Sequence, residues 1–142
     1  MSIRIIVDST ADITPAVRNR VDVVPLTIHF GEKEYIDGVT IDSKTFYEKL
    51  VESDVLPTTS QATPFAFEKA FRTAVESGDE VVCITCTSKL SGTYQSAVIA
   101  SENRDYVTAI DTKQVSVGQA AVVVEVAKQL EAHPEMSISQ AA

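Results

Sequence analysis

The sequence is poor in positive charge and contains no long hydrophobic run. Twelve Lys and Arg residues stand against twenty Asp and Glu residues, which leaves a formal net charge of −8. This balance argues against nucleic acid and anionic membrane surfaces as partners. No apolar run approaches the roughly 20 residues of a membrane span, and no basic segment followed by an apolar one opens the chain. We therefore expect a cytoplasmic protein without stable membrane insertion.

The common phosphate-binding and hydrolase motifs are also absent. The sequence contains no Walker A loop, no G-x-G-x-x-G and no G-x-S-x-G. Asp8 and Asp12 flank a polar turn after the first predicted strand, but they are four residues apart and not two, as a phosphatase of the haloacid dehalogenase type requires. A metal site is an open alternative, and the spacing favours a turn or capping role. Lys89 is the one cation near the hydroxyl-rich stretch described below, and we expect it to be solvated. These absences predict no catalytic residue and no cofactor.

Cysteine is scarce, and Cys83 and Cys86 are the only two. Their C-x-x-C spacing invites a metal or redox interpretation, but no second Cys or His pair completes a zinc site. A redox pair also requires a helix N-terminus that lowers the pKa of one thiol. Both residues instead lie in or at the end of a predicted buried strand. We expect reduced, inert thiols and no metal site.

What the sequence does contain is a regular alternation of strands and helices. Its 142 residues, 44% of them hydrophobic, suffice for one domain with a real core. Such alternation is typical of βαβ units, so we expect a single three-layer α/β/α domain over residues 1–142 with a mostly parallel sheet. The predicted strands include residues 4–7, 81–84 and 107–110, and the predicted helices include residues 15–19, 64–77, 93–100 and 117–130.

The segment between the first strand and the helix over residues 64–77 is less regular. Residues 21–30 read as extended, and residues 33–36 as the returning strand of a small hairpin. Asp42 can cap a helix over residues 43–53. The spacing of its apolar residues predicts an inner face made of Phe46, Leu50 and Tyr47. We expect residues 56–61 to form a loop.

The stretch from Val81 to Ala100 is the most informative of the chain. Residues 81–84 are apolar without alternation, which is typical of a parallel strand buried on both faces. A hydroxyl-rich turn follows, and then a helix over residues 93–100. Open α/β sheets bind ligands at the carboxyl ends of their strands, and a helix start favours an anion. The alternative is an ordinary connection in which Ser91 only caps the helix.

A second hydroxyl cluster, Pro57-Thr-Thr-Ser-Gln61, precedes the next helix. In an open α/β sheet this segment can approach the turn over residues 88–93. Together the two segments offer neutral donors with no nearby cluster of Lys and Arg. Such donors suit a single carboxylate better than a phosphate.

Several of these segments together resemble the DegV family of bacterial fatty-acid-binding proteins, which hand acyl chains to a fatty acid kinase. The segments occur in the family's order from Asp8 to Ala97, and the string Leu-Ser-Gly-Thr-Tyr-Gln-Ser-Ala is the most specific. The matching segments are Asp8-Ser-Thr-Ala-Asp12, Val24-Pro-Leu26, Phe30-Gly31, Tyr35-Ile-Asp-Gly38, Pro57-Thr-Thr-Ser-Gln61 and Ser88-Lys-Leu-Ser-Gly-Thr-Tyr-Gln-Ser-Ala97.

The resemblance implies a carrier for a long-chain fatty acid whose carboxylate is held by two hydroxyls. The family's carboxylate-binding threonine falls on Thr59 and its carboxylate-binding serine on Ser91. The surrounding positions of the two loops support the site: Ser60, Gln61, Ser88, Gly92 and Thr93. Ala62 departs from the family, which usually has proline after the glutamine.

Length is the larger departure, because family members are about twice as long and carry a second α/β domain. This sequence matches the first domain, so the resemblance implies that the C-terminal domain is absent and that the chain supplies half of a binding site. Two alternatives stay open. One is an enzyme that acts on a small carboxylated or phosphorylated metabolite at the same turn. The other is self-association through the face that the second domain would cover.

Overall fold

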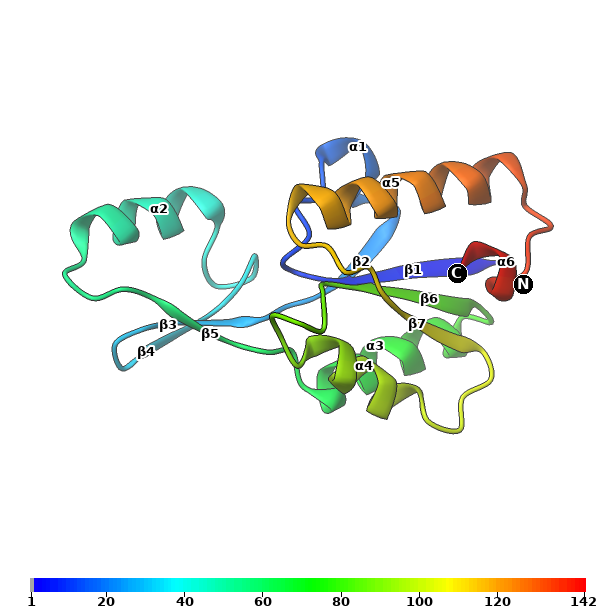
Figure 1. Ribbon diagram of the computed structural model, residues 1–142, viewed down its shortest axis with the longest axis horizontal. Coiled ribbons are helices and arrows are strands. Elements are labelled where there is room, and N and C mark those ends of the chain that lie inside the picture. The colour runs from blue at the N-terminus through cyan, green and yellow to red at the C-terminus, as the bar shows by residue number, and fades with distance from the viewer. Residues whose placement is uncertain (1) are drawn as a thin grey trace.

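A four-stranded parallel sheet forms the centre of the molecule. The computed structural model describes residues 2–142. The strand order is β2-β1-β6-β7, and each neighbouring pair is parallel. The expectation of a mostly parallel sheet is therefore confirmed (Figure 1). The bounds of these strands are β1 Ile3–Asp8, β2 Val21–Val24, β6 Glu80–Thr85 and β7 Val107–Asp111.

Helices cover both faces of this sheet, which confirms the three-layer α/β/α architecture. Helices α3 (Pro64–Glu76) and α4 (Thr93–Ser101) lie on one side. Helices α5 (Val117–Ala132), α1 (Pro15–Arg18) and the short α6 (Ile138–Ala141) lie on the other (Figure 1). None of the helices within residues 2–142 is both long and apolar enough to cross a bilayer.

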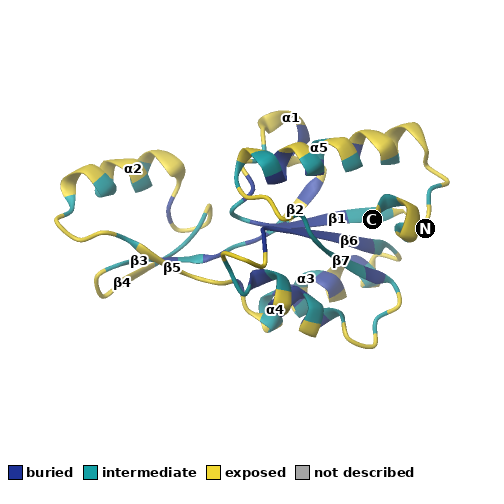
Figure 2. Cartoon of the chain, viewed as in Figure 1, coloured by how far each residue is buried: buried dark blue, intermediate teal, exposed yellow. Residues whose placement is uncertain are grey.

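The two central strands are buried on both faces, as the unalternating apolar runs predict. Figure 2 shows nearly all of β6 and the second part of β1 in the colour of buried residues. Ile6 and Cys83 pack with Phe67 and Phe71 on the side of α3 and α4. Strand residues of the opposite parity, such as Val7, pack on the side of α5. Burial of these apolar side chains on both sides of the sheet is the main stabilising contribution to the fold.

A smaller antiparallel lobe projects beyond the carboxyl ends of the parallel strands (Figure 1). Its strands are β3 (Thr27–Phe30), β4 (Lys33–Ile36) and β5 (Thr58–Ser60), in the order β4-β3-β5. Helix α2 (Ser43–Glu52) packs beside them. The predicted hairpin strand is confirmed, whereas the predicted extended segment over residues 21–30 divides into β2 and β3, which belong to different sheets.

Two expectations about the lobe are wrong. Residues 56–61 are not simply a loop, because Thr58–Ser60 is a strand that pairs with β3. Tyr47 does not lie on the inner face of α2, since it is 63% exposed. The predicted cap of this helix is confirmed by the Asp42 carboxylate, which accepts the Thr45 N–H at 2.7 Å. The strand was missed because its partner lies about 30 residues earlier and leaves no local signal.

Candidate functional site

The strand order places a topological switch point between β1 and β6. From β1 the chain crosses to β2 on one side, and from β6 it crosses to β7 on the other. The two connections diverge and leave a crevice at the carboxyl ends of the strands, where open α/β sheets bind ligands. A cavity of about 320 Å³, here called the switch-point pocket, lies there. Its lining residues are Thr10, Leu26, Thr59, Gln61, Cys86, Leu90, Ser91, Gly92 and Val115.

The structure brings the two hydroxyl clusters together at this pocket. Thr59 and Gln61 come from β5 and the segment after it, and Ser91 and Gly92 come from the loop between β6 and α4. The Gln61 side-chain amide donates to the Ser96 hydroxyl of α4 at 3.1 Å, which joins the two segments. The neighbouring Ala62 is buried in the core.

The Ser91 hydroxyl contacts both the backbone and the side chain of Thr93 at the start of α4. Gly92 is the N-cap residue of α4, while the Ser91 hydroxyl accepts the Thr93 N–H at 3.2 Å and lies 2.9 Å from the Thr93 hydroxyl. A serine hydroxyl has one proton and two lone pairs. When the fully buried Thr93 donates its own proton to Ser91, the Ser91 proton stays available to a ligand.

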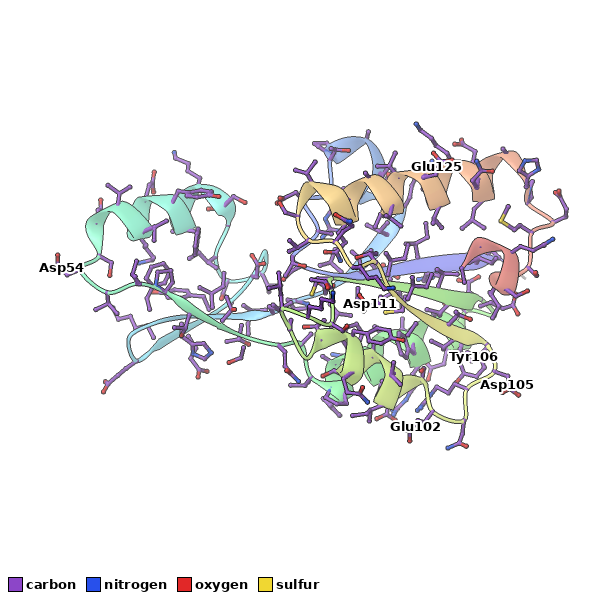
Figure 3. All side chains as sticks on the ribbon, viewed as in Figure 1. Asp54, Glu102, Asp105, Tyr106, Asp111 and Glu125 are labelled. Carbon is purple, nitrogen blue, oxygen red and sulfur yellow. The ribbon has the colours of Figure 1, made fainter. Side chains whose placement is uncertain are left out.

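Three of the predicted supporting residues lie outside the lining of the pocket. Ser60 points to the other face of β5 and contacts His29 Nε2 at 2.8 Å. Ser88 donates its hydroxyl to Asp111 at the end of β7 (labelled in Figure 3), at 2.6 Å, and this bond helps to hold the pKa of Asp111 below its usual value. Thr93 is buried, and its hydroxyl lies 2.9 Å from the Ser91 hydroxyl. Lys89 is exposed, in agreement with a solvated side chain.

Sequence reasoning missed five lining residues. They are Thr10, Leu26, Cys86, Leu90 and Val115. Thr10 follows β1 within the Asp8–Asp12 motif. Because β1 and β6 are parallel neighbours, knowledge of the strand order would have placed Thr10 beside the loop that follows β6. Leu90 is 74% exposed and Val115 is 42% exposed, which gives the pocket a partly apolar rim.

The lining residues of the switch-point pocket carry no formal charge. Its polar groups are hydroxyls, one amide and one thiol, which can hydrogen-bond a carboxylate without forming an ion pair. Within residues 2–142 no group of three His, Cys, Asp or Glu side chains is placed to hold a metal ion. The lining therefore places neutral hydrogen-bonding groups beside a partly apolar rim.

Both cysteines are free and buried. Burial raises the pKa of the Cys83 thiol, and the negative charge of Asp8 raises it further. The same two causes raise the pKa of Cys86. Since the thiolate is the reactive form, both shifts favour the expected inert thiols.

Asp8 takes the turn role expected of it and makes long-range contacts as well. Its carboxylate accepts the Thr10 N–H at 3.0 Å, which closes a turn after β1. It also accepts the Cys86 N–H at 2.7 Å, across the switch point. The side chain is fully buried. Asp12, in contrast, is exposed and accepts a hydrogen bond from the Ser116 hydroxyl.

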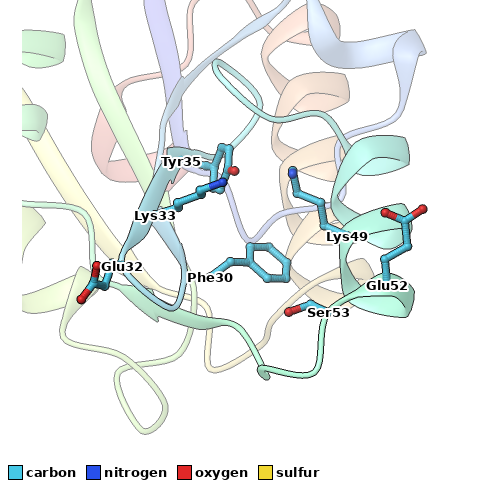
Figure 4. Close-up of a pocket in the computed structure, with 7 residues that line it drawn as sticks. All are labelled: Phe30, Glu32, Lys33, Tyr35, Lys49, Glu52 and Ser53. Carbon is cyan, nitrogen blue, oxygen red and sulfur yellow. The ribbon is translucent and has the colours of Figure 1, made fainter.

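A larger cavity, of about 500 Å³, lies in the lobe between the β3–β4 hairpin and α2 (Figure 4). The Lys49 ammonium stands over the Tyr35 ring, 5.4 Å from its centroid. The two lysines and two glutamates of the lining balance in charge, and the cavity is away from the switch point. Position and donor chemistry thus favour the smaller pocket. The lining of the lobe cavity comprises Phe30, Glu32, Lys33, Tyr35, Lys49, Glu52 and Ser53.

Gly92 allows the two pocket segments to approach each other. A Cβ atom at this position would lie 2.0 Å from Gln61 Oε1, so Gly92→Ala must displace the Gln61 side chain and break its bond to Ser96. The loss of one neutral hydrogen bond costs about 0.5–1.5 kcal/mol. We expect a folded variant with a small loss of stability in urea unfolding. In a Gln61→Ala background the same substitution should cost almost nothing, and equal costs in both backgrounds would contradict this contact.

Comparison with known proteins identifies the family. The family model described as "Uncharacterised protein, DegV family" matches residues 2–137. A DegV domain-containing protein of Clostridium perfringens is 37% identical over 133 residues, which cover 91% of this chain and 48% of that protein. One of Halalkalibacterium halodurans is 42% identical over 131 residues, covering 89% and 46%. The chain thus spans about half the length of the curated relatives it matches.

Solved structures show the same fold. One, described as fatty acid binding of a DegV family protein from Thermus thermophilus, has a TM-score of 0.86 and 34% identity, and covers 99% of this chain and 51% of that one. A fat acid (stearic acid)-binding protein from Eubacterium ventriosum has a TM-score of 0.87 and 33% identity, with coverage of 98% and 50%. Because the family model spans nearly the whole sequence and these folds match it throughout, the chain belongs to the DegV family.

Proposed function

We propose that this chain binds a long-chain fatty acid and holds its carboxylate in the switch-point pocket. The observation that carries the proposal is the meeting of Thr59 and Ser91 in one uncharged pocket at the carboxyl ends of the parallel strands. The carboxylate would accept hydrogen bonds from these two hydroxyls. The start of α4 at Gly92 adds a partial positive charge on the same side.

The described functions of relatives support this ligand class. The structures from Thermus thermophilus and Eubacterium ventriosum are described as binding fatty acids, the second of them stearic acid. A DegV family protein from Eubacterium eligens is described as loaded with heptadecanoic acid. In this chain the exposed Leu90 and Val115 at the rim of the pocket would contact the first methylenes of the tail.

We further propose that the chain is a carrier and that phosphoryl transfer belongs to a partner, a fatty acid kinase, as the family resemblance implies. An enzyme acting at Ser91 would need a general base within hydrogen-bond reach of its hydroxyl. The residues that line the pocket contain no histidine and no carboxylate. The free, buried cysteines suit a reducing compartment, so the proposal includes a cytoplasmic location.

Mass spectrometry of lipid extracted from the purified protein tests the ligand class directly. We expect long-chain fatty acids in the extract, at levels above those from an unrelated protein purified in the same way. A phosphorylated or small carboxylated metabolite in their place would favour the enzyme alternative. An extract free of fatty acid, together with no response in a fatty acid titration, would contradict the proposal.

Removal of either hydroxyl should weaken binding without unfolding the protein. A hydrogen bond to a charged group contributes about 1.5–3 kcal/mol, so Ser91→Ala should lower fatty acid affinity roughly tenfold or more. Thr59→Val keeps the shape of the side chain and should act in the same direction. Titration with a fluorescent fatty acid measures both effects. Ser77→Ala is a matched control, because Ser77 ends α3 at the opposite end of the sheet; an unchanged affinity for Ser91→Ala would remove Ser91 from the site.

A further inference from the structure

We propose that Asp8, held by Gln119, is a positioning residue for the head group of the fatty acid, an inference that rests on the function proposed above. Neither residue lines the switch-point pocket. Both are fully buried behind it, where polar side chains are costly unless every group is hydrogen-bonded. Their contacts join the ends of β1 and β6 to α5.

Every hydrogen-bond partner of the Asp8 carboxylate is a donor. One oxygen accepts the N–H of Thr10 at 3.0 Å and also the Thr10 hydroxyl. The other accepts the N–H of Cys86 at 2.7 Å and the Gln119 side-chain amide at 2.9 Å. Thr10 and Cys86 are both lining residues of the pocket. A single buried carboxylate therefore fixes two segments of the pocket wall.

Gln119 fixes the orientation of this carboxylate. Its amide nitrogen donates to Asp8 and, at 3.3 Å, to the Ile84 carbonyl of β6. Its carbonyl oxygen lies 2.8 Å from the Thr10 hydroxyl. Helix α5 is thereby tied to the ends of both central strands. Since Gln119 is fully buried, its side chain has little freedom to give up these contacts.

The chain itself connects the Asp8 contact to Ser91. Cys86, whose N–H donates to Asp8, begins the loop after β6 that carries Ser91, and both Cys86 and Ser91 line the switch-point pocket. A shift of the Cys86 backbone would therefore displace the proposed carboxylate-binding hydroxyl. Binding groups held within a fraction of an ångström are needed for full hydrogen-bond strength.

The variant Asp8→Asn distinguishes the role of Asp8 in positioning the pocket wall from the effect of its negative charge on an anionic ligand. The asparagine amide has one acceptor end and one donor end, so it leaves either the Thr10 N–H or the Cys86 N–H facing a donor. Removal of a nearby negative charge, in contrast, would by itself favour binding of an anion. The two effects have opposite signs, so a fall in affinity identifies the positioning role.

The test compares stearic acid with methyl stearate, which has the same tail and an uncharged head group, on residues 1–142 in a fluorescent-ligand displacement assay. For Asp8→Asn we expect the affinity for the acid to fall about tenfold, as for one lost charge-assisted hydrogen bond, while the affinity for the ester stays the same. Gln119→Met should lower the acid affinity in the same direction by a smaller factor. Asp12→Asn removes an equal charge from the same motif and should leave the affinities for the acid and the ester unchanged. Asp12 is exposed, and its carboxylate accepts a hydrogen bond from Ser116 and not from the Thr10 or Cys86 N–H.

A purely structural role for Asp8 would lower the melting temperature and leave the acid-to-ester ratio of the folded protein unchanged, and that result would overturn the inference. An increase in the ratio would overturn it as well, since charge would then be the only effect. If Asp8→Asn does not fold, the ratio of acid affinity to ester affinity measured for Gln119→Met tests the inference in its place. A wild-type chain that binds acid and ester equally would contradict the proposed function, and the inference with it. A wild-type preference for the acid that survives in Asp8→Asn would contradict the inference alone.

Discussion

A chimera that joins residues 1–142 to the second half of the Thermus thermophilus relative should bind stearic acid roughly 200-fold more tightly than residues 1–142 alone, if four more methylenes become buried. Each buried methylene contributes about 0.8 kcal/mol. The switch-point pocket has a volume of about 320 Å³, and Leu90 at its rim is 74% exposed. Pockets normally bury about 70–90% of a ligand's surface. We therefore expect the tail to lie partly in water when residues 1–142 act alone.

Calorimetric titration of both proteins measures the difference, with light scattering to establish that each is monomeric. Equal affinity in a monomeric chain of 142 residues would show that the pocket encloses the tail without a second half. Affinity that rises with the concentration of residues 1–142 would show instead that a second copy covers the apolar rim. Methyl stearate is a useful control, because the gain from tail burial should be the same for the ester as for the acid.

Phe67→Ala should lower the free energy of unfolding by about 3–5 kcal/mol. Phe67 is fully buried between α3 and the parallel sheet, and its ring lies 5.9 Å from that of Phe71. The substitution removes an aromatic side chain from a packed core and leaves a cavity that the surrounding side chains fill only in part. Because a domain is typically stable by about 5–15 kcal/mol, this one change removes a large share of the total.

Urea unfolding followed by circular dichroism measures this loss. Phe65→Ala is the matched control, since Phe65 lies two residues earlier in the same helix and is 74% exposed. We expect a change of at most about 0.5 kcal/mol for Phe65→Ala. A similar loss for both variants would show that the helix, and not the burial of Phe67, sets the cost.

The site and the core depend on different parts of the same strands. The core residues of β1 and β6 lie along their lengths, while the polar residues Asp8 and Thr10 follow at the carboxyl end of β1. Substitutions in the core should therefore change stability more than the affinity of the folded protein for fatty acid. Substitutions at Ser91 or Thr59 should do the reverse, which allows the two sets of predictions to be tested on one panel of variants.

Local sequence patterns were sufficient for most of the main sheet and its helices. The apolar runs of β1 and β6 lack alternation because both faces of these strands are buried. The Thr63-Pro64 pair begins α3, where the Thr63 hydroxyl accepts the Ala66 N–H at 3.2 Å. Such signals arise from residues within a few positions of one another. The hydroxyl clusters around Thr59 and Ser91 were visible for the same reason, and the motifs around them indicated the family.

Only the tertiary structure determined which residues meet. The β5 strand depends on pairing with β3, and residues 21–30 divide because their first part pairs with β1 and their second part with β4 and β5. Asp8 reaches Cys86 across 78 residues and Gln119 across 111 residues. Contacts between residues so distant in sequence are set by strand order and helix packing, which no local pattern encodes. Thr10 and Cys86 therefore entered the pocket, and Ser60 and Ser88 fell outside its lining, only when the strands were placed side by side.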